Sequence, residues 1–257
     1  MPFRIAHRDF FLLHILRELS PKYRIPWVGI IWTVGQPLLS SLAVASFVGP
    51  RLVERLVTQQ YFFYCWTGFS IWFFFSQSVQ ASCSTLNQKM KLVRGSLVPR
   101  EYLALSPVIA GLIELVFNFA IITLVVIPVL GPSLSFKTPF FMGLALLCMS
   151  LFALGLGFWV SALCLLFQDL KYLVSFLLQL GFLCTPVIYS PRISGLKSAL
   201  FFSNPVALSM KLMRAGIGVP QELGWGEVMG GTAFALLTFL TGYFYFQTKS
   251  KIFPELV

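Results

Sequence analysis

Glu114 is the one ionisable side chain that lies well inside a long apolar stretch, residues 106–130. Asn118 follows one helical turn later, so a helix places both on the same face. A carboxyl group inside a membrane is costly and is usually functional or paired. Two interpretations are open: proton coupling or substrate contact, and a structural hydrogen bond between helices. A lone acid without a second titratable partner makes a poor proton relay, which favours the structural interpretation.

The sequence contains no motif of a membrane-bound enzyme. It lacks G-x-x-x-x-G-K-[ST], so it has no phosphate-binding loop for ATP, and it also lacks H-E-x-x-H and G-x-S-x-G. Its two histidines, His7 and His14, both lie near the N-terminus, far from all five cysteines. We interpret the cysteines as small buried hydrophobic residues, in preference to disulfide or metal roles. We expect no cofactor or metal on this chain, and expect its energy source, if it has one, on another chain.

Composition predicts an all-α integral membrane protein. The chain has 257 residues, of which 57% are hydrophobic and 11% charged, against about 25% charged in soluble domains. The net charge of +10 indicates basic cytoplasmic loops and anionic lipid contacts before it indicates nucleic acid. Six apolar stretches reach the roughly 20 residues that a membrane-spanning helix needs. We place them at residues 29–48, 61–82, 106–130, 139–167, 172–189 and 228–247.

Residues 1–26 precede the first span and are too polar to cross a membrane. Apolar and charged residues alternate there, which is typical of an amphipathic helix lying at the membrane surface. A basic segment follows the second span, where we expect a short helix to end at Gly95, a C-terminal cap, and Pro99 to start the next helix. With both termini cytoplasmic, twelve of the 19 Lys and Arg residues fall on the cytoplasmic side and seven outside, as the positive-inside rule requires.

Residues 139–189 are too numerous for one membrane helix. We expect two spans joined by a short cytoplasmic loop at Gln168, Asp169 and Lys171, and a single long buried helix is the alternative. Small residues at every fourth position of the fourth span permit close helix packing. They are Ala153, Gly157 and Ser161.

The segment 190–227 contains two apolar pieces that are too short to cross the membrane, with Asn204-Pro205 between them marking a helix start. We expect two short re-entrant or interfacial helices on the outer side, either as a gate or as an interfacial loop without a gating role. The second span carries aromatic rings far beyond an interfacial belt. An aromatic path suits a sugar chain, and lipid-facing packing is the alternative.

Several segments resemble, in order and over nearly the whole chain, the permeases of polysaccharide-exporting ABC transporters. This type-2 group includes O-antigen, teichoic acid and capsule exporters. The most specific matches are Gly35-Gln36-Pro37, Gln168-Asp169-Leu170, Thr185-Pro186-Val187-Ile188-Tyr189 and Asn204-Pro205. Arg usually precedes the Asp in this pattern, and Gln168 departs from it, which removes the positive charge from this position.

The resemblance implies a single transmembrane domain over 1–257. It divides into an interface helix (1–26), spans 1–5 (27–189), outer gate helices (190–227), and span 6 with the tail (228–257). It implies a homodimer in the bacterial inner membrane, two copies of an ATPase subunit that hold ATP and Mg, and a polyprenyl-diphosphate-linked glycan as cargo.

On this resemblance we assign roles to three groups of residues. We expect the lipid diphosphate to be attracted by Arg4, Arg8, Lys22 and Arg24. We expect coupling to the ATPase to be made through Lys89, Lys91, Arg94, Arg100 and Asp169. We expect the glycan path to be lined by Trp66, Phe69, Trp72 and Phe73. A proton-coupled lipid or drug flippase that uses Glu114, and a membrane enzyme of lipid-linked sugar assembly, are the competing hypotheses.

Overall fold

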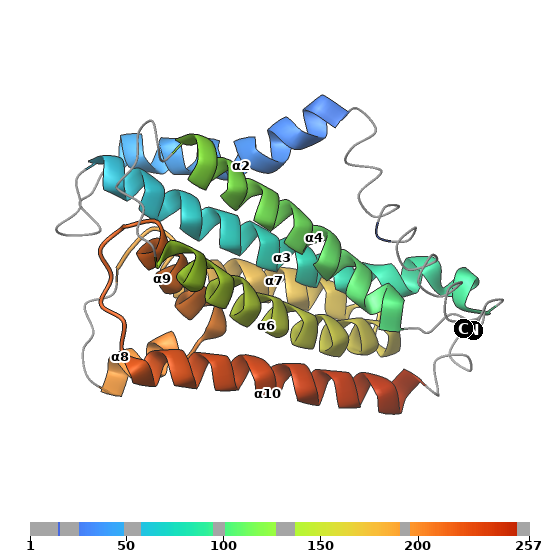
Figure 1. Ribbon diagram of the computed structural model, residues 1–257. Helices are drawn as coiled ribbons and strands as arrows, with labels where there is room; N and C mark the ends of the chain where they lie inside the picture. The colour runs from blue at the N-terminus through green and yellow to red at the C-terminus, as the bar shows by residue number, and fades with distance from the viewer. Residues whose placement is uncertain are drawn as a thin grey trace, which may run out of the picture.

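The computed structural model describes residue 15 and residues 26–48, 58–94, 101–126, 137–190 and 196–250. Within these ranges, side chains are described except at 26–28, 30, 86–94, 125–126, 196, 199 and 200. The described part is a bundle of helices without strands (Figure 1). The long helices are α2 (Pro26–Phe47), α3 (Thr58–Arg94), α4 (Glu101–Ile121), α6 (Thr138–Leu166), α7 (Leu170–Cys184) and α10 (Trp225–Ser250). The short ones are α8 (Leu196–Phe202) and α9 (Pro205–Gly216).

Each of the six predicted spans falls on one of the long helices. Among the described side chains, three stretches are long and apolar enough to cross a membrane: Glu101–Leu124, Thr138–Leu166 and Trp225–Ser250. The apolar parts of α2 and α7 are shorter. The structure therefore supports a membrane protein, and the count of six spans stays a prediction.

Helix α3 is longer than its predicted span, because the basic segment after residue 82 continues the same helix without a break to Arg94. Its 37 residues correspond to about 55 Å, against a hydrocarbon core of about 30 Å. One end of α3 must therefore project beyond the membrane. The short helix expected after the second span is therefore a continuation of α3. The helix end expected at Gly95 falls outside the described residues.

Prolines inside α2 and α4 remove a backbone donor, and a polar side chain contacts the affected carbonyl in each case. A helix pairs each N–H with the carbonyl four residues earlier, so Pro37 cannot donate to Thr33 and Pro107 cannot donate to Leu103. The Asn118 amide donates to the Thr33 carbonyl at 3.3 Å, and the Ser106 hydroxyl donates to the Leu103 carbonyl at 3.2 Å. Such replacement donors allow proline within membrane helices.

Helix α6 lies in the middle of the bundle, packed against α3, α4, α9 and α10 (Figure 1). Its closest crossing is with α10, where a Cβ on Gly155 would lie 2.6 Å from the Thr238 carbonyl oxygen and Gly242 faces Gly155. The predicted small-residue row also packs closely. Ala153 and Ser161 are fully buried, and a Cβ on Gly157 would lie 3.1 Å from Ser82 Oγ of α3.

The interpretation of all five cysteines as free residues is wrong for two of them. Cys83 of α3 and Cys164 of α6 form a disulfide across 81 residues of sequence. Neither lies in a spacing motif, so only the crossing of the two helices reveals the pair. Cys65 and Cys148 are free and buried, and Cys184 is free and exposed.

The chain bends between α6 and α7, as predicted. Helix α6 ends at Leu166 and α7 begins at Leu170, so the alternative of one long buried helix is wrong. Phe167, Gln168 and Asp169 are all exposed in this bend. Helix α7 itself packs loosely, because Val174 is its only buried residue.

The fifth predicted span ends earlier than residue 189. Helix α7 stops at Cys184, and Thr185 has the extended dihedrals that a residue before proline prefers. The non-helical segment 185–190 presents carbonyls without helix partners, and side chains from other helices donate to four of them in succession. Two of these donors are hydroxyls of α3, Tyr61 to Ile188 at 2.9 Å and Tyr64 to Tyr189 at 2.7 Å.

Arg214 of α9 supplies the remaining donors. Its Nη2 donates to the carbonyls of Pro186 and Val187, both at 2.9 Å, and its Nε donates to the Tyr64 carbonyl at 3.2 Å. The guanidinium also lies 3.4 Å from the Tyr64 ring centroid. Burial lowers the pKa of Arg214 because desolvation disfavours the charged form, yet arginine stays protonated in proteins. We call these contacts of Arg214, Tyr61 and Tyr64 the carbonyl clamp.

The predicted helix start at Asn204-Pro205 is confirmed. The Asn204 side chain caps α9 by accepting from the Val206 N–H at 3.0 Å, and Pro205 occupies its first turn. Every residue of α9 except Ala215 is buried. A second buried cation, Lys211, pairs with Glu227 of α10 at 2.5 Å, and Ser198 of α8 donates to the same carboxylate at 2.6 Å. Helix α9 is therefore covered by protein, whereas α8 carries the exposed Lys197. The re-entrant position of both helices stays a prediction.

We expect Arg214→Met to destabilise the protein strongly, because it leaves the carbonyls of Pro186 and Val187 without their donor. The expected loss is about 3 kcal/mol or more of unfolding free energy, measured by thermal unfolding in detergent micelles. Lys197→Met is the matched control, since Lys197 is exposed on neighbouring α8 and should change little. Equal stability of the two variants would contradict the clamp.

Candidate functional site

A cavity of about 890 Å³ opens between α2, α3, α4 and α7. Gly29 to Pro37 of α2 form one wall, Ser70 to Ser84 of α3 a second, and Pro107 to Asn118 of α4 a third. Ser175 and Leu178 of α7 contribute the fourth. This volume lies within the range of ligand sites, about 300–1,000 Å³, and it is the candidate functional site.

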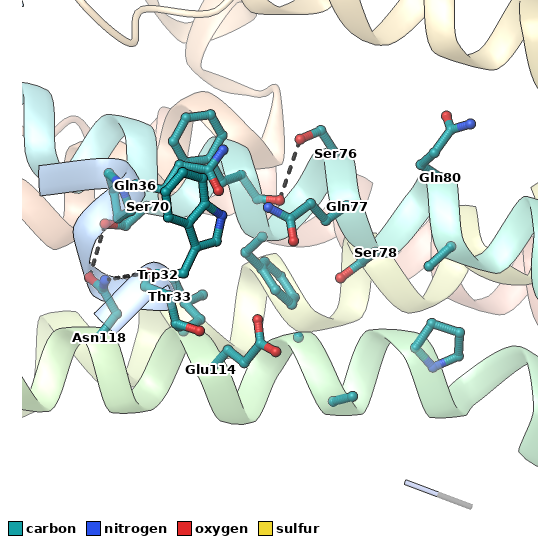
Figure 2. Close-up of a pocket in the computed structure, with 18 of the residues that line it drawn as sticks. Trp32, Thr33, Gln36, Ser70, Ser76, Gln77, Ser78, Gln80, Glu114 and Asn118 are labelled. Carbon is teal, nitrogen blue, oxygen red and sulfur yellow. Dashed lines mark hydrogen bonds between the residues drawn. The ribbon is translucent and has the colours of Figure 1, made fainter. Parts of the chain in front are cut away.

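Asn118 joins three of these helices at one end of the cavity. Its Oδ1 accepts from the Ser70 hydroxyl at 3.0 Å, and its Nδ2 donates to the Thr33 carbonyl at 3.3 Å (Figure 2). The side chain is 3% exposed. Asn118 thus makes a hydrogen bond between helices, to the carbonyl that Pro37 cannot pair. The choice between the two interpretations of Glu114 stays open.

Glu114 lies on the cavity wall, one turn before Asn118. Figure 2 shows its carboxyl group directed from α4 toward Trp32 of α2 and Gln77 of α3. Of the described residues that line the cavity, none is Lys, Arg or His. No group of three His, Cys, Asp or Glu side chains lies together in the part of the chain that is described, so those residues offer no metal site.

Helix α7 closes one side of the cavity through polar and aromatic contacts with α3. The Ser175 hydroxyl lies 3.0 Å from the Gln80 Oε1, to which it donates. Phe182 of α7 packs on Phe69 and Trp72, with ring centroids 6.0 and 5.7 Å away. Because α7 buries so little else, these contacts fix its position.

The four predicted glycan-path rings have different surroundings. Phe73 lines the cavity, and Phe69 stacks on it at 5.7 Å. Trp66, Phe69 and Trp72 are at most 6% exposed and belong to the core. The structure brings Phe73 alone among the four to the cavity surface, and the path through the other three stays a prediction.

The predicted charged residues lie elsewhere. Asp169 is exposed at the α6–α7 bend. Lys89, Lys91 and Arg94 belong to the last turns of α3, where only the backbone is described. The remaining assignments fall outside the described residues: Arg4, Arg8, Lys22, Arg24 and Arg100. Figure 1 places the end of α3, the α6–α7 bend and the end of α10 at the same end of the bundle.

Sequence reasoning missed two groups of functional residues. It treated Lys211 and Arg214 as outer loop charges, although two cations three residues apart in an apolar segment were a signal for buried partners. It also assigned no role to Gln36, Gln77 and Gln80, which line the cavity. Glutamines within apolar spans were the available signal, because each amide needs hydrogen-bond partners or water at membrane depth.

Comparison with known proteins gives consistent matches. The sequence pattern of the family described as "ABC-2 type transporter" matches residues 10–217. A Myxococcus xanthus protein named "O-antigen export system permease protein RfbA" is 28% identical over 212 residues, covering 81% of this chain and 80% of that protein. A Klebsiella pneumoniae protein of the same name is 28% identical over 252 residues, covering 96% of this chain and 92% of that protein.

Asn118→Leu removes the donor to the Thr33 carbonyl, and we expect it to lower the unfolding free energy by about 1 kcal/mol. The cost should fall when Pro37→Ala is also present, because residue 37 then regains an N–H for the same carbonyl. A double-mutant cycle on thermal unfolding in micelles measures this coupling. Strictly additive effects of the two substitutions would contradict the pairing.

Proposed function

Because this chain belongs to the ABC-2 type transporter family, we propose that it is the membrane permease of an ATP-driven exporter whose cargo is a polyprenyl-diphosphate-linked polysaccharide. The O-antigen export names of its relatives support this cargo over teichoic acid or capsule. The proposal rests mainly on the family match over residues 10–217. It places the chain in the bacterial inner membrane with both termini cytoplasmic.

The arrangement of helix ends supports this orientation. The start of α2 and the end of α10 lie at one end of the bundle, together with the basic end of α3 and the α6–α7 bend (Figure 1). Basic residues concentrate on the cytoplasmic side of membrane proteins. We assign this end to the cytoplasm, and it includes Lys89, Lys91 and Arg94.

An ATPase subunit carrying ATP and Mg would bind at the same end, in two copies. The end of α3 projects as an uninterrupted helix, and a continuous helix transmits movement of a bound partner to the cavity wall that it forms. Asp169, exposed on the neighbouring bend, is a second contact. Arg4, Arg8, Lys22 and Arg24 would attract the lipid diphosphate at this surface.

A second copy of the chain would pack against α7. This helix leaves large apolar side chains exposed, including Tyr172 at 67%, Phe176 at 55% and Leu183 at 68%. Lipid alone could cover them, but α7 also borders the cavity. A dimer built on α7 would bring two cavities near one shared path, which suits an elongated cargo.

The proposal is tested with inverted membrane vesicles that contain the chain, its ATPase partner and a lipid-linked glycan. We expect glycan to move into the vesicle lumen with ATP and not with a non-hydrolysable analogue. A proton-coupled flippase is the second candidate, because Glu114 lies on the wall of the cavity. Transport that needs a pH gradient, is lost in Glu114→Gln and persists without the ATPase would replace the proposal by that candidate.

We expect Asp169→Ala to weaken binding of the ATPase about fivefold, equivalent to about 1 kcal/mol, while leaving the choice of glycan unchanged. Copurification from detergent at graded salt concentrations measures the change. The control is Glu222→Ala, since Glu222 is an exposed acid in the connection before α10, far along the chain from the bend. If both variants retain the partner equally, Asp169 is not a contact.

A further inference from the structure

Helix α10 is held by polar contacts near both of its ends. At the end that we assign to the cytoplasm, the Gln247 Nε2 donates to the Glu101 Oε1 of α4 at 2.6 Å and to the Tyr243 hydroxyl at 3.1 Å. The amide nitrogen carries two donors, so both are used and the amide is fixed in orientation. Hydrogen bonds to a carboxylate are among the stronger ones in proteins. This contact therefore joins the last turns of α10 to the first residue of α4.

The opposite end of α10 is joined to the two short helices. Glu227, in the first turn of α10, accepts from Lys211 of α9 and from Ser198 of α8. The Glu227 side chain is buried, and breaking its contacts would leave a charge inside the protein without a partner, which is costly. Helices α8 and α9 must therefore follow the start of α10 when it moves.

Between these two ends α10 is a continuous rod. Its 26 residues correspond to about 39 Å, and it runs the length of the bundle (Figure 1). It contains no proline that could kink it. Along its middle it packs directly on α6, because a Cβ on Gly242 would collide with the Gly155 carbonyl group. A displacement of α10 at one end is therefore passed to the other end.

Glu101 lies where movement of a bound ATPase would arrive. It begins the helix that follows the projecting end of α3, which is the end assigned to the partner. A carboxylate at this place also has a simpler role, because a negative charge stabilises the start of a helix. The two roles make different demands. The helix start needs the charge on residue 101 itself, whereas a joint needs a donor and an acceptor facing each other across α4 and α10.

We propose that the Gln247–Glu101 hydrogen bond is the joint through which movement at the ATPase end is transmitted along α10 to the short helices α8 and α9. The inference rests on the proposed function for the ATPase partner and for the cytoplasmic end of the bundle. Glu101 and Gln247 are positioning residues, since neither lines the cavity. The two short helices then change position with each cycle of ATP hydrolysis.

The test uses the full chain with its ATPase partner in proteoliposomes and follows α8 with a fluorophore on Lys197→Cys, an exposed position of that helix. Cys184→Ser is included throughout, because Cys184 is free and exposed and would also be labelled. We expect ATP to change the fluorescence of the otherwise wild-type complex. Gln247→Leu should reduce this change, and the glycan exported per ATP hydrolysed, by about threefold or more, while ATP hydrolysis continues.

An exchange variant separates the joint from a role in starting α4. Glu101→Gln combined with Gln247→Glu keeps a donor facing an acceptor but removes the charge from the start of α4, and we expect it to restore the fluorescence change and the export. Thr248→Val is the matched control, since the Thr248 hydroxyl bonds the Phe244 carbonyl of its own helix, and it should alter neither. Thermal unfolding in micelles checks folding, and Gln247→Leu should lower the midpoint by no more than about 4 °C.

The outcomes distinguish this inference from the function on which it rests. ATP-dependent export that Gln247→Leu leaves intact, together with its fluorescence change, overturns the joint and leaves the exporter standing. An exchange variant as impaired as Gln247→Leu also overturns the joint, because the charge at the start of α4 is then what matters. A fluorescence change that Gln247→Leu removes, without any glycan export, supports the joint and rejects the polysaccharide cargo. Neither export nor a fluorescence change in the wild type overturns both proposals.

Discussion

The carbonyl clamp is the interaction on which the rest of this structure depends. A non-helical segment inside a membrane protein exposes carbonyls that neither lipid nor helix can pair, and here four of them accept from Arg214, Tyr61 and Tyr64. Arg214 suits this task because its planar group offers five donors in fixed directions. A buried cation is costly without such partners, so segment and cation stabilise each other.

The clamp also explains local sequence choices around it. Residue 68 of α3 must be glycine, since a Cβ there would lie 2.7 Å from the Val187 carbonyl oxygen and 2.8 Å from the Arg214 Nη2. The clamp attaches the end of α7 to α3 and α9, while α9 is held in turn by the Lys211–Glu227 pair to α10. Movement of α9 would therefore displace the end of α7, a helix whose Ser175 and Leu178 form part of the cavity wall.

The cavity and the clamp divide the bundle into two chemical regions. Toward the clamp, buried charges are fully paired, which favours a fixed structure. In the cavity, amides and hydroxyls face open space beside one carboxyl group. A transporter needs both, because a rigid frame transmits force and a path for sugars must offer weak, exchangeable contacts.

Sequence alone determined the membrane class, the order of the long helices and the bend at Asp169. These depend on hydrophobic length and on local helix signals such as Asn204-Pro205, which are properties of neighbouring residues. It also paired Asn118 with Glu114 on one face of α4.

Only the tertiary structure decided the Cys83–Cys164 bond, the partners of Arg214 and the cavity itself. Each joins residues far apart in the chain, such as Tyr64 and Tyr189, and depends on which helix faces meet. A single sequence records that Arg214 is charged and Ser78 is polar. Whether three carbonyls accept from the first, and whether the second is buried without a partner among the described groups, is fixed by the packing of α3, α4, α7 and α9. Burial and pairing are properties of the assembled bundle.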